Sequence, residues 1–395
     1  MTIKNEHNKI NVPNLRFPEF EGEWEESSIG EMFDLYSGNT PSRLNKEHFK
    51  GTINWISSGE LKEHYIYSSK EQISEEAAKS LKLLPVGTFV IAIYGLEAEG
   101  VRGTGSIIQE PSTISQACMS FIPKGVIENE FLYSWYKKHG NVIGIRYAQG
   151  TKQQNLSYDI LEKFRIAYPN SKEQEKLNNF ISLLDERIAT QNKIIEDLKK
   201  LKCAIIEKVY SEIQGKEYSY GQLFDVVNER NKQMEYSNIL SASQEKGMVN
   251  RDDLNLDIQF ERSNINTYKI VRKGDYVIHL RSFQGGFAFS DKLGVCSPAY
   301  TILRPNSLLE YGYLSNYFTS RSFIKSLVLV TYGIRDGRSI NVDEWLSMKT
   351  TIPSKEHQQY IVKVIGCFDR KIESEEAYAA HLSKQKQYLL RQMFI

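Results

Sequence analysis

Apolar residues recur every three or four positions along two stretches of about forty residues, 170–210 and 354–394. This spacing is typical of a long amphipathic helix whose apolar stripe packs against a partner helix, as in a coiled coil. Each stretch follows a proline, Pro169 or Pro353. Proline disfavours helix in the residue before it and suits the first helical turn. We therefore predict two long helices, each spanning roughly 60 Å at 1.5 Å per residue.

The two stretches align without a gap at an offset of 184 residues. Only seven of 40 positions in 171–210 are identical, but the polar interruptions of the stripe also coincide, Gln191 with Glu375 and Lys202 with Lys386. Unrelated heptads would not share their defects in register, so the pattern indicates an internal duplication. The residues expected to pack between these helices are Ile181, Leu184, Ile188, Ile195, Leu198, Ile205, Ile365, Phe368, Ile372, Ala379, Leu382 and Leu389.

The duplication extends upstream of the helices. The same offset relates Leu156 to Ile340 and Asp159 to Asp343, and earlier segments match with small shifts, as loop insertions would produce. Each half therefore has the order globular region, then helix. The predicted division is an N-terminal extension (1–23), a first globular region (24–169), a first helix (170–214), a second globular region (215–352) and a second helix (353–395).

The globular regions combine strand and helix patterns. Runs rich in β-branched and aromatic residues predict strands, and periodic stretches predict helices. The strands are expected at Thr88–Tyr94, Cys118–Ile122, Tyr276–Leu280 and Tyr300–Leu303, and the helices at Glu130–Lys138 and Tyr311–Ser320. We predict a mixed α/β (α+β) fold with two pseudo-symmetric domains separated by two long antiparallel coiled-coil helices. A parallel homodimeric coiled coil is the alternative packing.

Composition adds three constraints. Hydrophobic residues make up 41% and aromatic residues 11% of the chain, which is enough for packed cores. The absence of an apolar run of 18 residues argues against a membrane span. The four cysteines are widely separated and have no Cys-x-x-Cys spacing, so neither a disulfide framework nor a metal site is indicated. We expect a cytoplasmic protein.

Charge is concentrated locally. The net charge of +1 argues against strong non-specific nucleic-acid binding. However, residues 272–338 hold nine basic and four acidic residues, and residues 137–165 hold six and two. Several loops also carry side chains that can read base edges, although any one of them has the alternative of an ordinary solvated loop. The candidate DNA-binding residues are Thr40, Ser42, Arg43, Tyr94, Arg102, Gln149, Lys152, Gln153, Gln154, Arg281, Ser282, Gln284, Arg335, Arg338 and Ser339.

Motifs for catalysis by this chain alone are missing. The sequence has no Pro-Pro pair of the kind found in amino-methyltransferase motifs, no P-loop, and no histidine pair with metal-ligand spacing. The triplet Glu60-Leu-Lys62 fits the end of a nuclease motif, but such triplets arise often by chance and the nearest upstream aspartate is Asp34. We therefore predict no catalytic residues.

Two motifs carry a resemblance to a known family. The first is the segment Leu15-Arg-Phe-Pro-Glu-Phe-Glu-Gly-Glu-Trp24. The second is the repeated pattern Pro-x-x-x-x-Gln followed by Asp-x-x-Ile, at Pro169, Gln174 and Asp185 and again 184 residues later. Together they resemble the specificity (S) subunit of type I restriction–modification enzymes over nearly the whole chain. One departure is His357, which stands where an acidic residue usually precedes the glutamine.

The resemblance implies a non-catalytic subunit with two target-recognition domains that read the halves of an asymmetric bipartite DNA site. It also implies two methylation (M) subunits docked on spacer helices, which methylate adenine with S-adenosylmethionine. Restriction (R) subunits would supply ATP- and Mg-dependent cleavage, so this chain itself would carry no cofactor. Two alternatives remain at this stage: a coiled-coil scaffold whose ends bind proteins, and a nuclease or methylase that acts alone.

Overall fold

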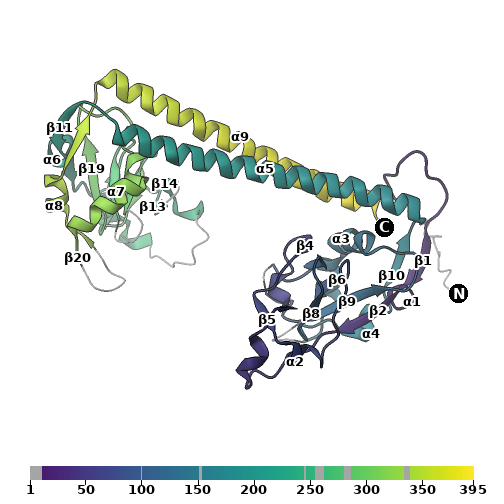
Figure 1. Cartoon of the computed structure of the whole chain (residues 1–395). Helices are drawn as coiled ribbons and strands as arrows, with labels where there is room; N and C mark the ends of the chain where they lie inside the picture. The colour runs from purple at the N-terminus through teal and green to yellow at the C-terminus, as the bar shows by residue number, and fades with distance from the viewer. Residues whose placement is uncertain are drawn as a thin grey trace. The chain divides into compact units, whose positions relative to one another are not determined.

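The structure of the chain, a computed structural model, describes residues 11–98, 100–150, 154–243, 246–253, 262–279, 286–332 and 339–395. It divides into two compact units (Figure 1). Unit 1 comprises Met1–Gln191 and Tyr378–Ile395, and unit 2 comprises Asn192–Ala377. The long helices α5 (Ser171–Ser211) and α9 (Lys355–Met393) each contribute to both units. Each unit therefore combines a globular region with a part of both helices.

The globular region of unit 1 is built on a five-stranded sheet. Its strands are β1 (Glu25–Ser28), β2 (Phe33–Ser37), β3 (Ile53–Ile56), β4 (Tyr65–Ile66), β5 (Glu71–Ile73), β6 (Phe89–Ala92), β7 (Gly105–Ile108), β8 (Ser112–Ile114), β9 (Cys118–Pro123) and β10 (Arg165–Tyr168). Its helices are α1 (Ile29–Met32), η1 (Lys46–Phe49), η2 (Ser58–Glu60), α2 (Glu75–Ala78), α3 (Asn129–Tyr147) and α4 (Tyr158–Leu161). The main sheet has the order β2-β9-β6-β7-β4, beside a smaller sheet β5-β3-β8 and the pair β1-β10. Helix α3 packs on the main sheet and buries Phe131 and Leu132 in the core.

Unit 2 repeats the centre of this arrangement. Its strands are β11 (Lys216–Ser219), β12 (Phe224–Val227), β13 (Leu240–Ser243), β14 (Gly247–Asn250), β15 (Lys269–Val271), β16 (Tyr276–Ile278), β17 (Phe287–Phe289), β18 (Gly294–Cys296), β19 (Thr301–Pro305), β20 (Thr331–Tyr332), β21 (Ser339–Ile340) and β22 (Lys349–Ile352). Its helices are α6 (Tyr220–Leu223), η3 (Arg251–Asp253), η4 (Arg262–Thr267), η6 (Tyr317–Thr319), α7 (Arg321–Ser326), η7 (Leu327–Val330) and α8 (Val342–Ser347). The sheet order β12-β19-β16-β17 matches β2-β9-β6-β7 of unit 1, and the pair β11-β22 matches β1-β10.

The prediction of a helix at Tyr311–Ser320 is wrong. Residues 311–316 form turns, a short 3-10 helix follows, and α7 begins only at Arg321. Gly312 has a φ of 71°, a left-handed conformation that interrupts a right-handed helix. The hydroxyl of Ser320 caps α7 by accepting a hydrogen bond from the backbone N–H of Phe323. The apolar periodicity of this segment indicates burial, but it does not reveal that the helix is broken.

Helices α5 and α9 run antiparallel within each unit. In unit 1, Lys386 donates to Asp185 at 2.5 Å, and in unit 2, Lys202 donates to Asp369 at 2.5 Å. The offset of 184 relates Asp185 to Asp369 and Lys202 to Lys386. Each copy therefore supplies the acid of one pair and the lysine of the other. This exchange is what a pseudo-two-fold relation between duplicated antiparallel helices requires.

The residues predicted to pack between the helices are all at least partly buried. The most enclosed are Ile181, Ile195, Ile365, Ile372 and Leu382. The others are half-buried, namely Leu184, Ile188, Leu198, Ile205, Phe368, Ala379 and Leu389. Ile206 and Leu390 are more deeply buried than their predicted neighbours Ile205 and Leu389, and they too are related by the offset of 184. The buried apolar positions therefore shift by one residue near the end of each long helix.

A buried glutamine joins the start of each long helix to its globular region. The amide of Gln174 accepts from the N–H of Glu128 at 3.0 Å and donates to the carbonyls of Val126 (3.1 Å) and Pro169 (2.9 Å). The side chain is completely enclosed. All three hydrogen bonds connect it to backbone, so the amide both caps the local chain and fixes the helix to the loop before α3.

The second copy repeats this geometry. Gln358 accepts from the N–H of Glu310 at 2.7 Å and donates to the carbonyls of Leu308 (3.0 Å) and Pro353 (3.1 Å). It is also completely enclosed. The glutamine of the repeated sequence motif is therefore a structural joint in both units.

A histidine links the globular region of unit 1 to α5. The ring of His64 stacks between Tyr65 and Tyr133, with centroid separations of 4.1 and 3.9 Å. Its Nε2 lies 2.8 Å from Glu130, and its Nδ1 lies 3.6 Å from Asp185. Burial disfavours the charged ring, but the hydrogen bonds and charges of the two carboxylates outweigh this cost, so the pKa of His64 is raised.

This shift predicts a pH dependence of stability. A raised pKa in the folded protein means that protonated His64 stabilises the fold below the ordinary value of about 6.5, and that this contribution is lost as the pH rises through the folded-state value. Above pH 8 a second group interferes, because burial, followed by the charge of Lys386, lowers the pKa of Lys137 to about 8. Denaturant unfolding of unit 1 between pH 6 and 8 should therefore show falling stability, and His64→Gln should flatten this slope. An unchanged slope in the variant would contradict the assignment.

Candidate nucleic-acid interface

Two loops that carry candidate residues meet in unit 1. The segment after β6 pairs with the hairpin after α3 through backbone bridges between Tyr94 and Asn155 and between Gln149 and Asn155. The N–H of Leu96 donates to the carbonyl of Gln154 at 3.1 Å. The structure thus brings Tyr94 together with Gln149 and Gln154, which lie more than 50 residues later in the sequence.

Arg102 joins the same cluster but is held in place. Its Nη2 donates to Oε1 of Gln154 at 3.0 Å. Its aliphatic part crosses Gly144 of α3 so closely that a Cβ on this glycine would lie 2.5 Å from Cγ of Arg102. Such packing suggests that Arg102 orients the hairpin, and Tyr94 and Gln149 are the more exposed candidates.

The candidates Thr40, Ser42 and Arg43 lie on a different loop of unit 1. Arg43 donates two hydrogen bonds to the carboxylate of Glu71, at 2.6 and 2.7 Å. Its guanidinium carbon also lies 4.3 Å from the ring centre of Phe49 and 5.3 Å from that of Trp55. An exposed ion pair of this kind contributes at most about 1 kcal/mol, so a phosphate or a base can compete for the guanidinium. Nothing in the spacing of the sequence indicated Glu71 as its partner.

Most candidates of unit 2 lie outside the described residues. These are Arg281, Ser282, Gln284, Arg335 and Arg338, together with Lys152 and Gln153 of unit 1. The backbone that flanks them is described. The N–H of His279 donates to the carbonyl of Gly286 at 2.7 Å, and β20 pairs with β21 through Thr331 with Ile340 and Tyr332 with Ser339. Both loops are therefore closed at their bases by antiparallel backbone pairing.

The hairpin after α3 in unit 1 and the hairpin after η7 in unit 2 are structurally equivalent. In unit 1 the closing pair is Gln149 with Asn155, and in unit 2 it is Tyr332 with Ser339. Asn155 and Ser339 are related by the offset of 184. The framework of the hairpin is thus shared, while the residues between the closing pairs differ in the two copies.

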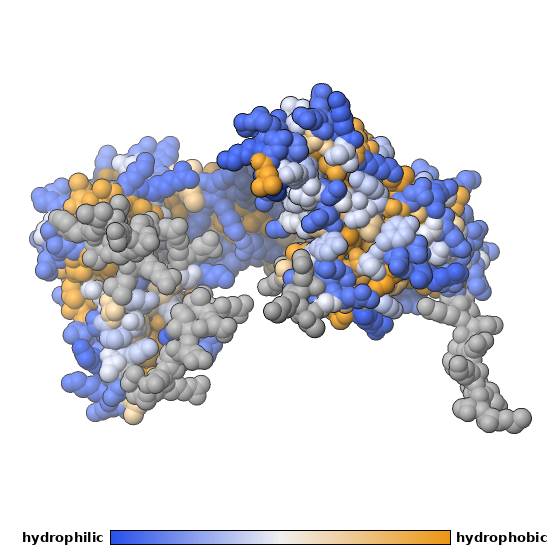
Figure 2. Space-filling view, turned by 90° about the horizontal axis from the view of Figure 1, so that it is seen from below, coloured by the Kyte–Doolittle hydropathy of each residue, from blue (hydrophilic) through white to orange (hydrophobic). Residues whose placement is uncertain are grey.

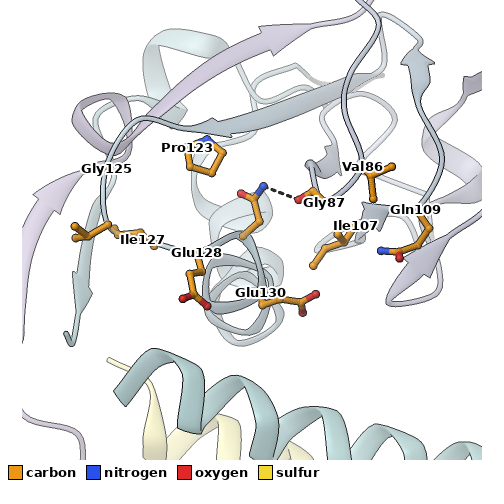
Figure 3. Close-up of a pocket in the computed structure, with 11 residues that line it drawn as sticks. Val86, Gly87, Ile107, Gln109, Pro123, Gly125, Ile127, Glu128 and Glu130 are labelled. Atoms are coloured by element: carbon orange, nitrogen blue, oxygen red, sulfur yellow. Dashed lines mark hydrogen bonds between the residues drawn. The ribbon is translucent and has the colours of Figure 1, made fainter. Parts of the chain in front are cut away.

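One pocket of unit 1 is lined by other residues. A pocket of about 500 Å³ is lined by residues that include Val86, Gln109, Glu128 and Glu130. Figure 3 shows Glu128 directed toward α5, where Asn178 donates to its carboxylate at 2.8 Å, and the Asn129 side chain donates to the carbonyl of Gly87 at 2.7 Å. None of the candidate DNA-binding residues lines this pocket. Its acidic lining is unsuited to a phosphate backbone.

Within the described ranges, no group of three or more histidine, cysteine, aspartate or glutamate side chains is arranged to hold a metal ion. In the same part of the chain, no helix is long and apolar enough to cross a membrane.

Sequence comparison relates the chain to known proteins. A family model described as the type I restriction modification DNA specificity domain matches residues 21–200. The specificity subunit of the type I restriction enzyme MjaIX of Methanocaldococcus jannaschii is 27% identical over 212 residues, or 51% of this chain and 48% of that protein. The EcoR124I/EcoR124II specificity subunit of Escherichia coli is 30% identical over 222 residues, or 55% and 51%. The chain thus spans about half the length of the curated relatives it matches.

Two solved structures have a similar fold. The S subunit of a type I restriction–modification system from M. genitalium superposes with a TM-score of 0.53 at 15% identity, over 97% of this chain and 99% of that chain. A chain from a study of complex assembly and conformational transition of the type I R-M system gives 0.62 at 14% identity, over 94% and 97%. The predicted mixed α/β class with long antiparallel helices is confirmed.

Proposed function

Because the chain belongs to the specificity-subunit family of type I restriction–modification systems, we propose that it selects an asymmetric, bipartite DNA target for such a system. The observation that carries this proposal is the equivalent pair of hairpins, closed at Asn155 and at Ser339. They occupy the same place in two duplicated units but contain different residues. Equivalent placement favours two readers of one kind, and different side chains favour two different half-sites.

Partner subunits supply the chemistry in this proposal. Methylation subunits would use S-adenosylmethionine, restriction subunits would use ATP and Mg²⁺, and the chain itself would hold no cofactor. The long helices support docking because they leave apolar side chains exposed. In unit 1 these include Leu183 and Tyr388, and in unit 2 they include Ile194, Leu201 and Tyr360. Exposed apolar positions along a helix are typical of surfaces that bind another protein.

Methylome sequencing tests the proposed function. In cells that produce the chain together with its methylation subunit, we expect methyladenine in one motif made of two different short sequences separated by a fixed gap. Cells with the methylation subunit alone serve as the control and should lack this motif. A continuous palindromic motif would contradict the bipartite target. Methylation or cleavage of DNA by the purified chain alone would contradict the non-catalytic role.

A further inference from the structure

Each unit exposes a large apolar side chain just before its hairpin. Ile145 in unit 1 is 61% exposed and Leu329 in unit 2 is 75% exposed. The offset of 184 relates these two residues, and it also relates Ile143 to Leu327, which are both buried. In both copies, therefore, one side chain faces the core and the next but one faces outward, although Ile145 lies in an α-helix and Leu329 in a 3-10 helix. Figure 2 shows that apolar patches interrupt the hydrophilic surface of the molecule.

The backbone beneath both side chains is firmly anchored. Ile145 lies in the last turns of α3, which buries Tyr136 and Ile143 on its other face. Leu329 lies in η7 between the buried Leu327 and Val330. Because anchored backbone holds the two side chains out, their exposure does not come from a loose segment. Single exposed apolar side chains are common on protein surfaces, but exposure at the same place in both duplicated copies points to a shared role.

The charge carried by the two segments themselves favours a polyanion, and the nearby acid Glu207 of α5 is engaged by the N–H groups of Arg321 and Ser322 at the start of the second segment. The whole chain has 50 basic and 49 acidic residues, yet neither 141–150 nor 321–332 contains an acidic residue. Both segments present exposed basic side chains, Arg146 in unit 1 and Arg321 and Lys325 in unit 2. An apolar side chain flanked by cations, with no acid in the segment, matches DNA, whose apolar base stack lies between two rows of phosphates.

We propose that Ile145 and Leu329 are equivalent apolar wedges, each of which enters the duplex at one half-site and separates two stacked base pairs. This proposal rests on the proposed function and deepens it. Apolar side chains that enter between base steps through the minor groove unstack them and kink the duplex, and the extra protein–DNA contact offsets the cost. Arg146 and Lys325 are placed to hold the neighbouring phosphates, which fixes the position of each wedge.

Fluorescence of 2-aminopurine tests the wedges. The full chain is assembled with its methylation subunits on duplexes that carry the methylome-derived target, with 2-aminopurine moved step by step through each half-site except at the methylated adenine. The wild-type complex should give increased fluorescence at one step in each half-site. Ile145→Ala should remove the signal in one half-site only and Leu329→Ala in the other only. Each variant should also bind roughly tenfold more weakly.

Two leucines provide matched controls. Leu83 in unit 1 and Leu293 in unit 2 are 53% and 42% exposed, and they lie outside the two acid-free segments. Leu83→Ala and Leu293→Ala should leave both fluorescence signals and the affinity unchanged, which would show that the effect belongs to Ile145 and Leu329.

Four results would overturn the wedges. Specific binding by the wild-type complex without any fluorescence change, or signals that persist in both alanine variants, would reject them and leave the proposed function intact. Loss of the methylation subunit from the variant complexes in size-exclusion chromatography would show that the two side chains face protein instead of DNA. A wild-type complex that prefers no sequence would reject the proposed function, and the wedges with it.

Discussion

Replacing Arg16 by leucine should lower the free energy of unfolding of unit 1 by about 3–5 kcal/mol. Nε and Nη2 of Arg16 donate to the carboxylate of Glu173 at 2.8 and 2.7 Å, and Nε1 of Trp24 donates to the same carboxylate at 3.4 Å. Glu173 is only 1% exposed. Without the guanidinium, a buried carboxylate at the start of α5 loses its balancing charge, and the desolvation cost remains. Urea unfolding monitored by tryptophan fluorescence measures the loss.

Two controls define this prediction. The double variant Arg16→Leu/Glu173→Leu should recover much of the stability, because an apolar pair no longer leaves a charge buried. The exposed pair of Arg165 and Glu26 is the matched surface control, and Arg165→Ala should cost less than about 1 kcal/mol. A loss in Arg16→Leu no larger than that of Arg165→Ala would show that the buried pair does not stabilise unit 1.

The second copy shows why the buried ion pair of Arg16 and Glu173 has no duplicate in unit 2. His357 occupies the place of Glu173 and is exposed. Strand β11 follows α5 after only a few residues, so unit 2 has no counterpart of the segment that carries Arg16 and Trp24. Without an arginine opposite it, the negative charge of an acidic residue at this position would not be neutralised. The departure from the family pattern is therefore a consequence of where the N-terminal segment packs.

Replacing the buried glutamine by leucine should destabilise either unit by about 2–4 kcal/mol. Gln174→Leu leaves the N–H of Glu128 and two carbonyls without their partners, and Gln358→Leu does the same around Glu310. Leucine is close in size, so the loss comes from unsatisfied polar groups and not from a cavity. Urea midpoints of the two single variants should fall by similar amounts, since the geometry is the same.

Gln359 offers the matched control for the glutamine joint. It lies next to Gln358 but is exposed, and its side chain donates to Glu310 at 3.2 Å. Gln359→Leu should change the free energy of unfolding by less than about 0.5 kcal/mol. If Gln174→Leu and Gln358→Leu were equally mild, the amide would be incidental, and the repeated motif would need another explanation.

The sequence predicted where the long helices lie more readily than which residues interact with one another in the fold. The two long helices follow from local signals, a proline at the start and an apolar period, and both are present. Alignment of the copies related Asp185 to Asp369 and Lys202 to Lys386, but an alignment does not reveal that the copies exchange partners. Arg16 and Glu173 are 157 residues apart, and no local pattern connects them. Such pairs depend on the tertiary fold.

The candidate site was predicted less completely than the fold. Polar loops were recognised by composition, which does not distinguish a side chain that is free to bind DNA from one that is engaged. Arg43 is engaged by Glu71 and Arg102 by Gln154, in both cases through contacts across loops. The exposed Ile145 and Leu329 were missed because a lone apolar residue in a helical stripe suggests burial. Their shared offset was the signal that could have found them.

The division of α9 between the units has a consequence for biosynthesis. The core of unit 1 includes Leu390, Met393 and Phe394, yet the rest of that unit is encoded before Gln191. A ribosome must therefore synthesise all of Asn192–Ala377 before the first unit can close its core. Contacts this distant in sequence form slowly and leave apolar surface uncovered during translation. The nascent first unit thus depends on completion of the second, which couples the maturation of both units to a single late event.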